Sequence, residues 1–540
     1  MRAEVTELRG GATVATRPQQ PIVTVVNGRR RLDRFELALL LVFACISLWV
    51  LALDLREVLL HGRVWTGTDG FFIVDQMQYL AWVRSASHGL IANMFVLHSR
   101  PADYFQPAVA ISGLITALGV APWASLLLWK PVAVASTFFA FRVYAHRSVF
   151  GRSQRCAVLA LALFYGSFSV VYGSFSVVGD LFPSFLTWGY PFGLIAVAAM
   201  AFALLIYERA RSASRVPWTP ALLGALASSL HPWQGELLIL IVVGAELYHW
   251  RERRWTRRAL ELPLLTVLGT AVPLLYYVIL GRLDISWTLA RDASKHAFPF
   301  LAIALGLAPL ALVALLGYRG RPRSFLATVT RVWPIAALLV YFLSATALSA
   351  TPLHAFEGIT LPLAVLAVDG AKRAGWRRIP GHRPLAVALI VATTIPATVF
   401  LLHTAVTYVA PQPGNANFIT GDESSALSYL VRDPVKGGVL TRFYLGEVVP
   451  ERADRRTFVG NCLWSEPNCL SKAYAVQQLF NGVLSPAAAR GFVQGTGARF
   501  LLIDCETATN LYRELAPLIV STRTFGCARI YELDDSKTET

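Results

Sequence analysis

The sequence predicts an all-α polytopic membrane protein of about 11 transmembrane helices, with a small α/β exocytoplasmic domain at its C-terminus. Three observations predict this fold class. Only 15% of the 540 residues are charged, whereas a soluble protein carries about 25%. The mean hydropathy is +0.51. Apolar runs long enough to cross a bilayer recur from residue 35 to residue 407. Together these features exclude an ordinary soluble enzyme, a disordered chain and a single-span receptor.

The net charge of +16 is concentrated in short loops between the apolar runs. Six basic segments hold 28 Lys and Arg residues, whereas the four segments that alternate with them hold 7. By the positive-inside rule, this asymmetry places the N-terminus in the cytoplasm and the C-terminal region outside. The basic segments are 1–34, 142–155, 208–216, 251–258, 319–331 and 372–383. Nucleic acid is not an expected partner, because its binding needs a basic patch on one folded domain.

Three regions follow from these patterns. Residues 1–34 are expected to form a cytoplasmic tail, and 35–407 a transmembrane module with a large first outside loop at 55–104. The apolar segment 106–120 is too short to span, so we expect a helix lying at the membrane surface. The predicted spans are 35–54, 122–142, 156–172, 187–207, 217–232, 234–250, 260–280, 298–318, 332–350, 354–371 and 384–407.

Residues 408–540 differ in composition from the membrane module, with 13 basic and 14 acidic residues. Helical patterns alternate here with short apolar strands, which predicts a small α/β domain. The expected helices lie near 424–430, 485–495 and 507–517, and the expected strands near 438–441, 499–503 and 528–532.

Four cysteines fall in this outside region, where disulfides are permitted. We expect Cys462 to pair with Cys469 and Cys505 with Cys527. Free buried thiols are the alternative. A zinc site is disfavoured, because the spacing matches no common pattern and the region contains no His.

The first outside loop carries two carboxylates, Asp69 and Asp75, among aromatic residues. A helical pattern begins near Val74, which places Asp75 in the first turn of a helix, where a negative charge is favoured. Asp75 is therefore a candidate catalytic base, and Asp69 is a second candidate. The alternative for Asp75 is a helix cap with no chemical role.

Three features combine with this loop. Asp75 adjoins a Gln-x-x-Tyr-Leu helix, a surface helix begins at Gln106-Pro107, and the next span carries Trp129-Lys130-Pro131. This layout resembles the GT-C class of membrane glycosyltransferases, in particular the protein O-mannosyltransferases and the bacterial lipid-linked sugar transferases. The resemblance in layout covers about residues 35–407, and the matching motif runs from Asp75 to Tyr79.

The resemblance implies a polyprenyl-phosphate sugar donor, and a glycan, lipid or protein of the cell envelope as acceptor. It implies inverting transfer at the outer face of a bacterial cytoplasmic membrane, with Asp75 as base. Positive charge would stabilise the departing phosphate, and Lys130, Arg84 and Arg100 are the candidates for binding phosphate or lipid. Lys130 is equally well explained as a side chain that extends to the membrane interface.

Three residues depart from the family pattern. Many members carry Asp-Glu or Asp-Asp where this chain has Asp75-Gln76, and the surface helix has a single proline, Pro107. The basic residue of the following span is often Arg, whereas here it is Lys130. The first departure argues against a metal held by this loop. No cofactor is indicated, although a divalent metal is compatible with the class, and no metal ligands are assigned.

Further candidate substrate-binding residues lie on the helix after Asp75 or at the predicted outer ends of spans: Gln78, Tyr79, His231, Trp233, Gln234, Glu236, His354 and Glu357. Aromatic rings, side-chain amides and carboxylates are groups that commonly contact sugars. The alternative for residues 231–236 is a helix-hairpin turn with an interfacial Trp. For His354 and Glu357 the alternative is a helix cap.

Two other classes of function remain open. A secondary transporter or a lipid or glycolipid flippase would share the hydropathy pattern, but it favours charges deep in the spans and paired repeats. A non-catalytic scaffold of envelope assembly would explain Asp75-Gln76. The chain has no Walker A motif and no dinucleotide fingerprint, which disfavours ATP-driven transport by this chain alone.

Overall fold

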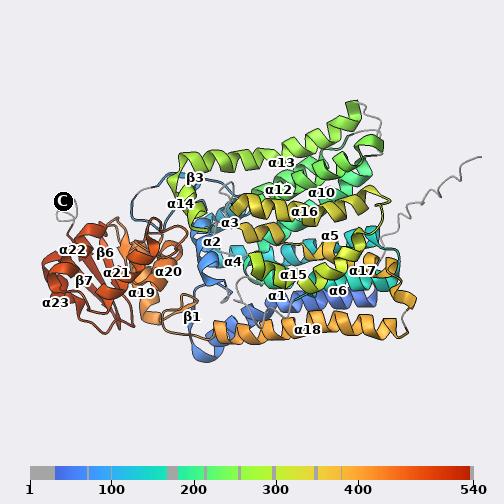
Figure 1. Ribbon diagram of the computed structural model, residues 1–540. Helices are drawn as coiled ribbons and strands as arrows, with labels where there is room; N and C mark the ends of the chain where they lie inside the picture. The colour runs from blue at the N-terminus through green and yellow to red at the C-terminus, as the bar shows by residue number, and fades with distance from the viewer. Residues whose placement is uncertain are drawn as a thin grey trace, which may run out of the picture.

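The computed structural model describes residues 31–69, 72–98, 100–166, 181–211, 216–252, 257–294, 300–345, 351–378 and 380–534. A bundle of long helices lies on one side, and a smaller domain with a sheet caps one end of it (Figure 1). Most of the predicted cytoplasmic tail, 1–34, and parts of the predicted spans 156–172, 298–318 and 332–350 fall outside the described residues.

Eight helical segments in the described ranges are long and apolar enough to cross a membrane. They are α1 (Arg34–His61), α4 with α5 (Pro122–Leu127 and Trp129–Ser148), α10 (Pro191–Ala210), α13 (Arg257–Leu283), α15 with η2 (Phe300–Leu315 and Leu316–Tyr318), α16 (Phe325–Ala345), η3 with α17 (Pro352–Phe356 and Thr360–Arg373) and α18 (His382–Val409). Three shorter helices occupy the other predicted spans: α6 (Arg152–Phe164), α11 (Thr219–Leu230) and α12 (Pro232–Tyr248). A helix therefore stands at each of the eleven predicted positions, and the predicted fold class is confirmed.

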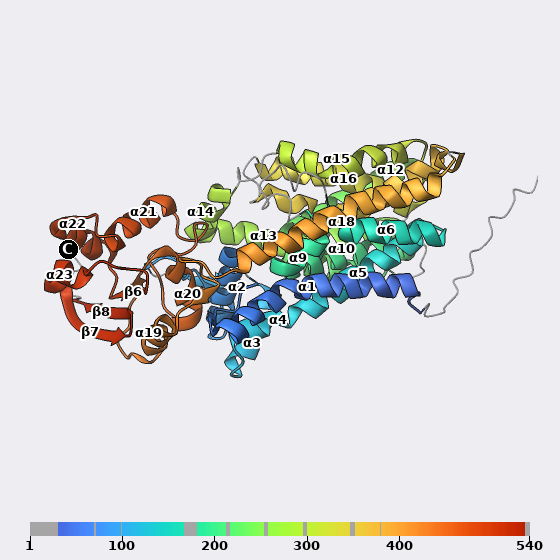
Figure 2. The same ribbon diagram turned by 90° about the horizontal axis from the view of Figure 1, so that it is seen from below.

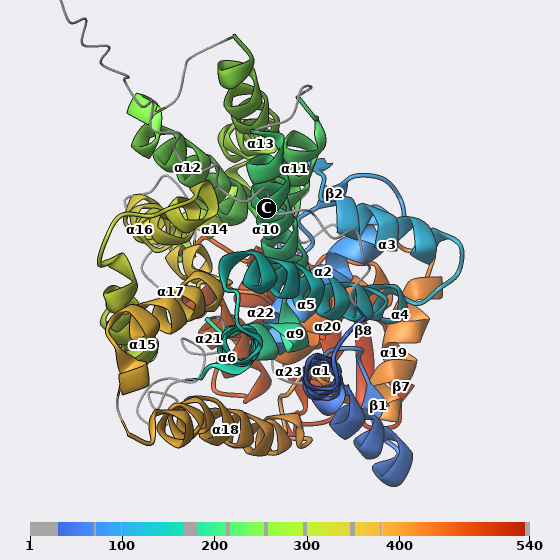
Figure 3. The same cartoon turned by 90° about the vertical axis from the view of Figure 1, so that its right-hand side faces the viewer.

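The helices differ in how deeply they are buried. The most apolar windows of α10 and α17 are 83% and 89% buried, so these two helices form the middle of the bundle. In α13 and α18 only 17% of the most apolar window is buried, and leucine and valine side chains of these helices face outward. An apolar outer face is what lipid contact requires. Figure 3 views the bundle from the end opposite the smaller domain and shows α13 and α18 at its periphery.

Several helix boundaries differ from the prediction by a few residues, and the start of the ninth span has an identifiable cause. The ninth span was expected to begin at residue 332, but α16 begins at Phe325 and includes Arg331. The Arg331 guanidinium donates hydrogen bonds to the backbone oxygens of Ala327 (2.8 Å) and Gly317 (2.7 Å). Because these carbonyls satisfy the charged group, the helix continues through a residue that the charge pattern assigned to a loop.

The first outside loop forms α2 (Ile73–Ala86) and a two-stranded ladder of β2 (Ile91–Ala92) and β3 (Ala102–Tyr104). The predicted surface helix is α3 (Pro107–Ala117), which has 11 residues. The Gln106 side chain accepts a hydrogen bond from the Val109 amide (2.7 Å) and so caps its first turn. Leu114 and Leu118 are 66% and 85% exposed at its end, as expected for a helix that contacts the bilayer surface.

The C-terminal domain contains a four-stranded sheet with the order β5-β6-β8-β7. The strands are β5 (Val439–Leu440), β6 (Phe500–Ile503), β7 (Ile519–Phe525) and β8 (Ala528–Leu533), and only the β5–β6 pair is parallel. The helices are α19 (Gly421–Arg432), α20 (Phe443–Ala453), α21 (Cys469–Phe480), α22 (Pro486–Thr496) and α23 (Leu511–Leu515). Helices α20 and α21 and strand β7 have no counterpart among the elements expected from the sequence. Disulfides join Cys462 to Cys469 and Cys505 to Cys527, the pairs expected from the sequence.

The domain packs directly on the loop that carries Asp75. Met77 and Leu80 of α2 share one buried apolar cluster with Leu445 and Val448 of α20. A short ladder between β1 (Val64–Trp65) and β4 (Phe418–Ile419) adds a second connection. Figure 2 shows α2 and α20 meeting at the end of the bundle. One face of α2 therefore serves as part of the core of the C-terminal domain.

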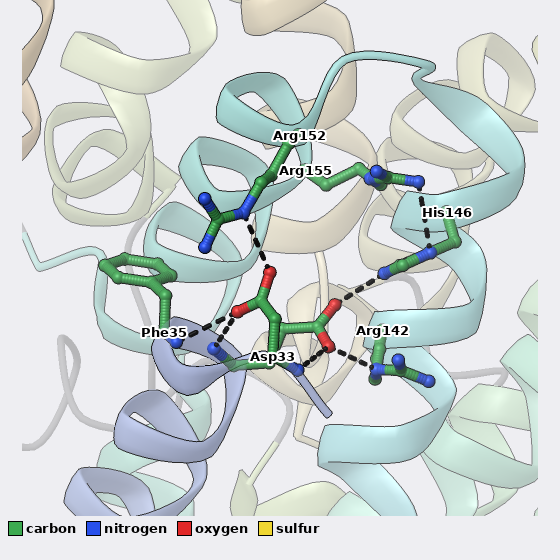
Figure 4. Close-up of polar contacts among 7 residues, drawn as sticks. Asp33, Phe35, Arg142, His146, Arg152 and Arg155 are labelled. Carbon is green, nitrogen blue, oxygen red and sulfur yellow. Dashed lines mark hydrogen bonds and ion pairs between the residues drawn. The ribbon is translucent and has the colours of Figure 1, made fainter. Parts of the chain in front are cut away.

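The opposite end of the bundle is held by a polar cluster at the start of α1 (Figure 4). The Glu36 carboxylate accepts hydrogen bonds from Arg142 (3.0 Å) and contacts His146 (2.6 Å), both on α5. Asp33 caps α1 through the amides of Phe35 and Glu36 and forms an ion pair with Arg152 of α6 (3.1 Å). These contacts join the first three spans where the predicted basic loops lie.

Candidate functional site

Asp75 lies in the first turn of α2, as the sequence predicts. Its Oδ2 accepts a hydrogen bond from the Tyr190 hydroxyl (2.5 Å). Tyr190 stands between α9 (Pro183–Gly189) and α10, where Pro191 begins a new helix. Within the part of the chain that the structure describes, the other carboxylate oxygen, Oδ1, accepts no hydrogen bond. Asp75 therefore has one oxygen held in place and one that can accept a proton.

Burial raises the pKa of the Asp75 carboxyl above its ordinary value. The hydrogen bond from Tyr190 and the nearby His354 act in the opposite direction and stabilise the charged form. A carboxylate with a raised pKa is a stronger base, which favours proton abstraction near neutral pH.

Three predicted residues meet a short distance from Tyr190. His354 lies in η3, Glu357 follows it, and His231 precedes α12. The His354 Nδ1 is 2.7 Å from Glu357 Oε1, and the His231 Nδ1 is 3.4 Å from Glu357 Oε2. The ring of Tyr190 packs edge-on against His354 at 5.7 Å. The fold thus joins residues from two distant segments beside Asp75.

His231 and the first turn of α12 place side chains around the same histidine. Trp233 packs on His354 with ring centroids 4.6 Å apart, and the Gln234 side-chain amide donates to the His354 carbonyl (3.2 Å). Gly235 of α12 lets α11 pack closely, because an added Cβ would lie 1.9 Å from Ser228 Oγ. Glu236 is half-buried on the first turn of α12. Trp233 and Gln234 therefore support the His354 position.

Asp69 and Lys130 form a buried ion pair, an arrangement the sequence analysis did not anticipate. The Lys130 ammonium also donates to the Thr187 carbonyl (2.8 Å). The Gln76 side chain accepts from the Asp69 amide and donates to the Trp188 carbonyl. Gln76, the departure from the family pattern, thus holds the Asp69 loop against α9.

A cavity of about 20 Å³ adjoins this pair, with Tyr79 and Gly67 among its lining residues. A single water needs roughly 10–15 Å³, so the space does not hold a phosphate. Lys130 can bind a donor phosphate only after Asp69 or the surrounding side chains rearrange.

Gln78 and Tyr79 lie on α2, and their side chains make packing contacts with neighbouring segments. Gln78 accepts a hydrogen bond from the indole of Trp464 in the C-terminal domain. Tyr79 packs edge-on against Trp82 and Phe192 at 5.5 and 5.2 Å. The loop between Cys462 and Cys469 therefore reaches α2 through Trp464.

Arg84 and Arg100 lie apart from Asp75. The Arg84 Nε donates a hydrogen bond to the Glu451 carbonyl (3.0 Å). Arg84 also lines a separate cavity of about 290 Å³, together with Trp123 and Arg452. Arg100 lies in the loop before β3, and its carbonyl accepts a hydrogen bond from Arg456 (3.3 Å). The structure does not bring either arginine together with Lys130.

Two residues of the site were missed by the sequence analysis. Tyr190 lies in the sequence Gly189-Tyr190-Pro191, whose glycine and proline mark a break between helices, and this signal was available. Glu447 of α20 is only 4% exposed. Burial raises the pKa of its carboxyl, and the negative charge of Asp75 raises it further. Nothing in the local sequence places Glu447 near α2.

No protein-family model and no curated protein matches the chain. Solved structures do. An apo oligosaccharyltransferase from Archaeoglobus fulgidus is 12% identical with a TM-score of 0.54, and the match covers 89% of this chain and 71% of that one.

The arabinofuranosyltransferase AftD from Mycobacteria is 16% identical with a TM-score of 0.53. The match covers 92% of this chain but only 40% of that one. At these identities the likeness concerns the fold. The chain has the fold of the GT-C membrane glycosyltransferases.

Proposed function

We propose that this protein is an integral membrane glycosyltransferase that moves a sugar from a polyprenyl-phosphate donor to an acceptor of the cell envelope. The reaction takes place at the outer face of a bacterial cytoplasmic membrane. The N-terminus is cytoplasmic and the C-terminal domain is exocytoplasmic. The distribution of basic loops supports this orientation.

The observation that carries the proposal is the environment of Asp75. A carboxylate in the first turn of a buried helix has one oxygen fixed by Tyr190 and a pKa raised by burial. It lies where the membrane bundle meets the C-terminal domain. This is the end of the bundle at which a lipid-linked donor from the bilayer and an acceptor from outside would meet.

The structural neighbours support the donor class. One structure of the Archaeoglobus fulgidus oligosaccharyltransferase, with a TM-score of 0.50 and 12% identity, is described as a complex with an inhibitory peptide and a dolichol-phosphate. AftD is described as an arabinofuranosyltransferase. A polyprenyl phosphate matches the apolar outer faces of this bundle, which would hold the lipid tail in the bilayer.

The chemistry assigned to the site is direct displacement with inversion. Asp75 accepts the proton of the acceptor hydroxyl while that oxygen attacks the anomeric carbon, and the polyprenyl phosphate departs with the electrons of the broken bond. Lys130 supplies positive charge to the phosphate once its contact with Asp69 has been exchanged. In this scheme Asp69 holds Lys130 until the donor binds.

A panel of polyprenyl-phosphate sugars tests the proposal. Donor binding is measured by native mass spectrometry, and transfer is measured with envelope extracts as acceptor. Both are compared among the purified full-length protein, the variants Asp75→Asn and Lys130→Gln, and the control Asp103→Asn. Asp75→Asn is expected to retain donor binding and lose transfer, Lys130→Gln to weaken binding, and Asp103→Asn to change neither. Binding of no donor by the wild type would overturn the donor assignment, and full transfer by Asp75→Asn would overturn the role of Asp75.

A further inference from the structure

His231, His354 and Glu357 bring three metal-ligating side chains together. One ligand atom from each residue lies within 4.8 Å of the other two. His231 and His354 are 5% and 7% exposed, and Glu357 is fully buried. Three ligand-type side chains converge here from two segments of the chain that are far apart in sequence.

Two polar atoms in the cluster have no hydrogen-bond partner among the described residues. They are His231 Nδ1 and Glu357 Oε2, which lie 3.4 Å apart. The two atoms face each other at the distance of an ion pair, without hydrogen-bond geometry. Charged groups in protein interiors are normally hydrogen-bonded or bound to metal. A cation between these two atoms would satisfy both.

The backbone around Glu357 leaves room for its carboxylate. An added Cβ at Gly193 of α10 would lie 2.7 Å from Glu357 Oε2. Gly358, the next residue in the chain, has φ +74, and an added Cβ would lie 2.4 Å from Val197 Cγ1. Two glycines therefore allow α10 to approach the carboxylate closely while its Oε2 stays directed at His231.

From this geometry we propose that His231, His354 and Glu357 bind a divalent transition-metal ion, with zinc as the first candidate. Two imidazoles and one carboxylate form a set that zinc accepts while keeping a fourth position open for an oxygen ligand. Tetrahedral bonds of about 2.0–2.1 Å separate ligand atoms by about 3.4 Å. His231 Nδ1 is already 3.4 Å from Glu357 Oε2. His354 Nδ1, which is 2.7 Å from Glu357 Oε1, would have to move about 0.7 Å away from it.

The outer contacts of the cluster also suit a metal site. Gln234 donates to the His354 carbonyl (3.2 Å), and the Trp233 ring packs on both histidines. Such contacts fix the orientation of ligand side chains. Tyr190 packs against His354 at 5.7 Å and donates a hydrogen bond to Asp75, so the cluster adjoins the proposed base. A metal held there could bind a phosphate or hydroxyl oxygen of a substrate. That last step rests on the proposed function, whereas binding of the metal itself does not.

Metal binding is measured without donor or acceptor. Full-length protein in nanodiscs is stripped with a chelator, and Zn²⁺ affinity and stoichiometry are determined by calorimetry and elemental analysis. The variants are His231→Gln and Glu357→Gln. The control is His146→Gln, because His146 contacts a buried carboxylate, Glu36, at 2.6 Å without a second imidazole (Figure 4).

The wild type and His146→Gln are expected to bind about one Zn²⁺ per chain. The two cluster variants are expected to bind at least about tenfold more weakly. Absence of Zn²⁺ binding by the wild type, or equal affinity in all four proteins, would overturn the proposal.

A second measurement avoids the risk that a cluster variant fails to fold. Wild-type protein loaded with Mn²⁺ is examined by pulsed electron paramagnetic resonance, which detects nitrogen atoms bound to the ion. Couplings to imidazole nitrogen are expected, and their absence from the loaded protein would also overturn the proposal. A metal site without transfer activity would leave this inference standing while the proposed function fails.

Discussion

Tyr190 donates a hydrogen bond of 2.5 Å to Asp75, and the two residues are 115 positions apart in the chain. The bond joins the first turn of α2 to the break between α9 and α10. It fixes one oxygen of the proposed base and stabilises its charged form, while burial has the opposite effect on the pKa. The protonation of Asp75 therefore depends on how these two segments pack.

Replacing Tyr190 with Phe is expected to raise the pKa of Asp75, because the charged carboxylate loses its donor. A hydrogen bond to a charged group contributes about 1.5–3 kcal/mol, or about one to two pH units. Asp75 acts as a base only when deprotonated, so the acidic limb of kcat should move to higher pH by about that amount.

The pH profile of transfer by Tyr190→Phe checks this prediction. Tyr277→Phe serves as the control, since the Tyr277 hydroxyl donates to the Ser229 carbonyl and not to Asp75. A uniform loss of activity at every pH would contradict a role in setting the pKa.

Replacing Asp75 with Asn should reduce kcat by about 10²–10⁴, the usual contribution of a general base. Asn preserves the size of the side chain and can still accept a hydrogen bond from Tyr190. Single-turnover transfer with saturating donor separates this effect from binding. An unchanged rate of the chemical step would show that the proton is taken by another group.

Replacing Glu447 with Gln should stabilise the protein at alkaline pH. The folded-state pKa of Glu447 is raised above its ordinary value of 4.5, so the native state binds more protons than the unfolded state above that pH. The wild type therefore loses stability as pH rises from about 4.5 towards the raised pKa. The amide variant lacks this dependence.

Thermal unfolding at several pH values tests the role of Glu447. The Tm difference between Glu447→Gln and the wild type should be near zero at pH 4.5 and grow with pH. Glu466→Gln, a partly exposed carboxylate of the same domain, is the control. A difference that does not change with pH would exclude a contribution from Glu447 ionisation.

Removing the Cys462–Cys469 disulfide should loosen the contact between the C-terminal domain and α2. The loop closed by this bond carries Trp464, whose indole donates to Gln78. Loop-closure entropy for so short a loop gives about 2–3 kcal/mol. Cys462→Ser/Cys469→Ser should lower the Tm of the domain, as seen in Trp fluorescence.

The Cys505–Cys527 bond closes a longer loop, with a sequence separation of 22, and this loop does not contain Trp464. Its removal should lower stability by about 3 kcal/mol and leave the environment of Trp464 unchanged. Equal spectral changes in both double variants would argue against a specific link through Trp464.

The Glu36 cluster should contribute far more to stability than the surface pair beside it (Figure 4). The Glu36 and Arg142 side chains are 5% and 13% exposed, and breaking a buried pair costs about 3–5 kcal/mol. Glu36→Ala should therefore lower the Tm and the yield of folded protein. The Arg152 side chain is 70% exposed in its pair with Asp33. Arg152→Gln should therefore lower the free energy of unfolding by less than about 1 kcal/mol. Comparable losses in both variants would contradict this ranking.

Local patterns in the sequence were enough to predict much of the fold. The eleven spans, the start of α2 near Val74 and the disulfide pairs all depend on residues close together in the chain. Apolar length and the excess of basic residues at one membrane face are local quantities that act on each helix separately. The prediction was less accurate where a tertiary contact intervened, as when carbonyl groups accepted the Arg331 guanidinium inside α16.

The site depends on packing between distant segments. Amino-acid type identified Asp75, Lys130, His231, His354 and Glu357 as candidates, but nothing near them in the chain indicates their partners. Lys130 pairs with Asp69, while His231 and His354 converge on Glu357. These partnerships arise when helices cross at particular positions in the bundle, and many side chains acting together set those crossings. The chemistry available to the chain can therefore be read from its residues, whereas the assignment of each residue to a site requires the folded bundle.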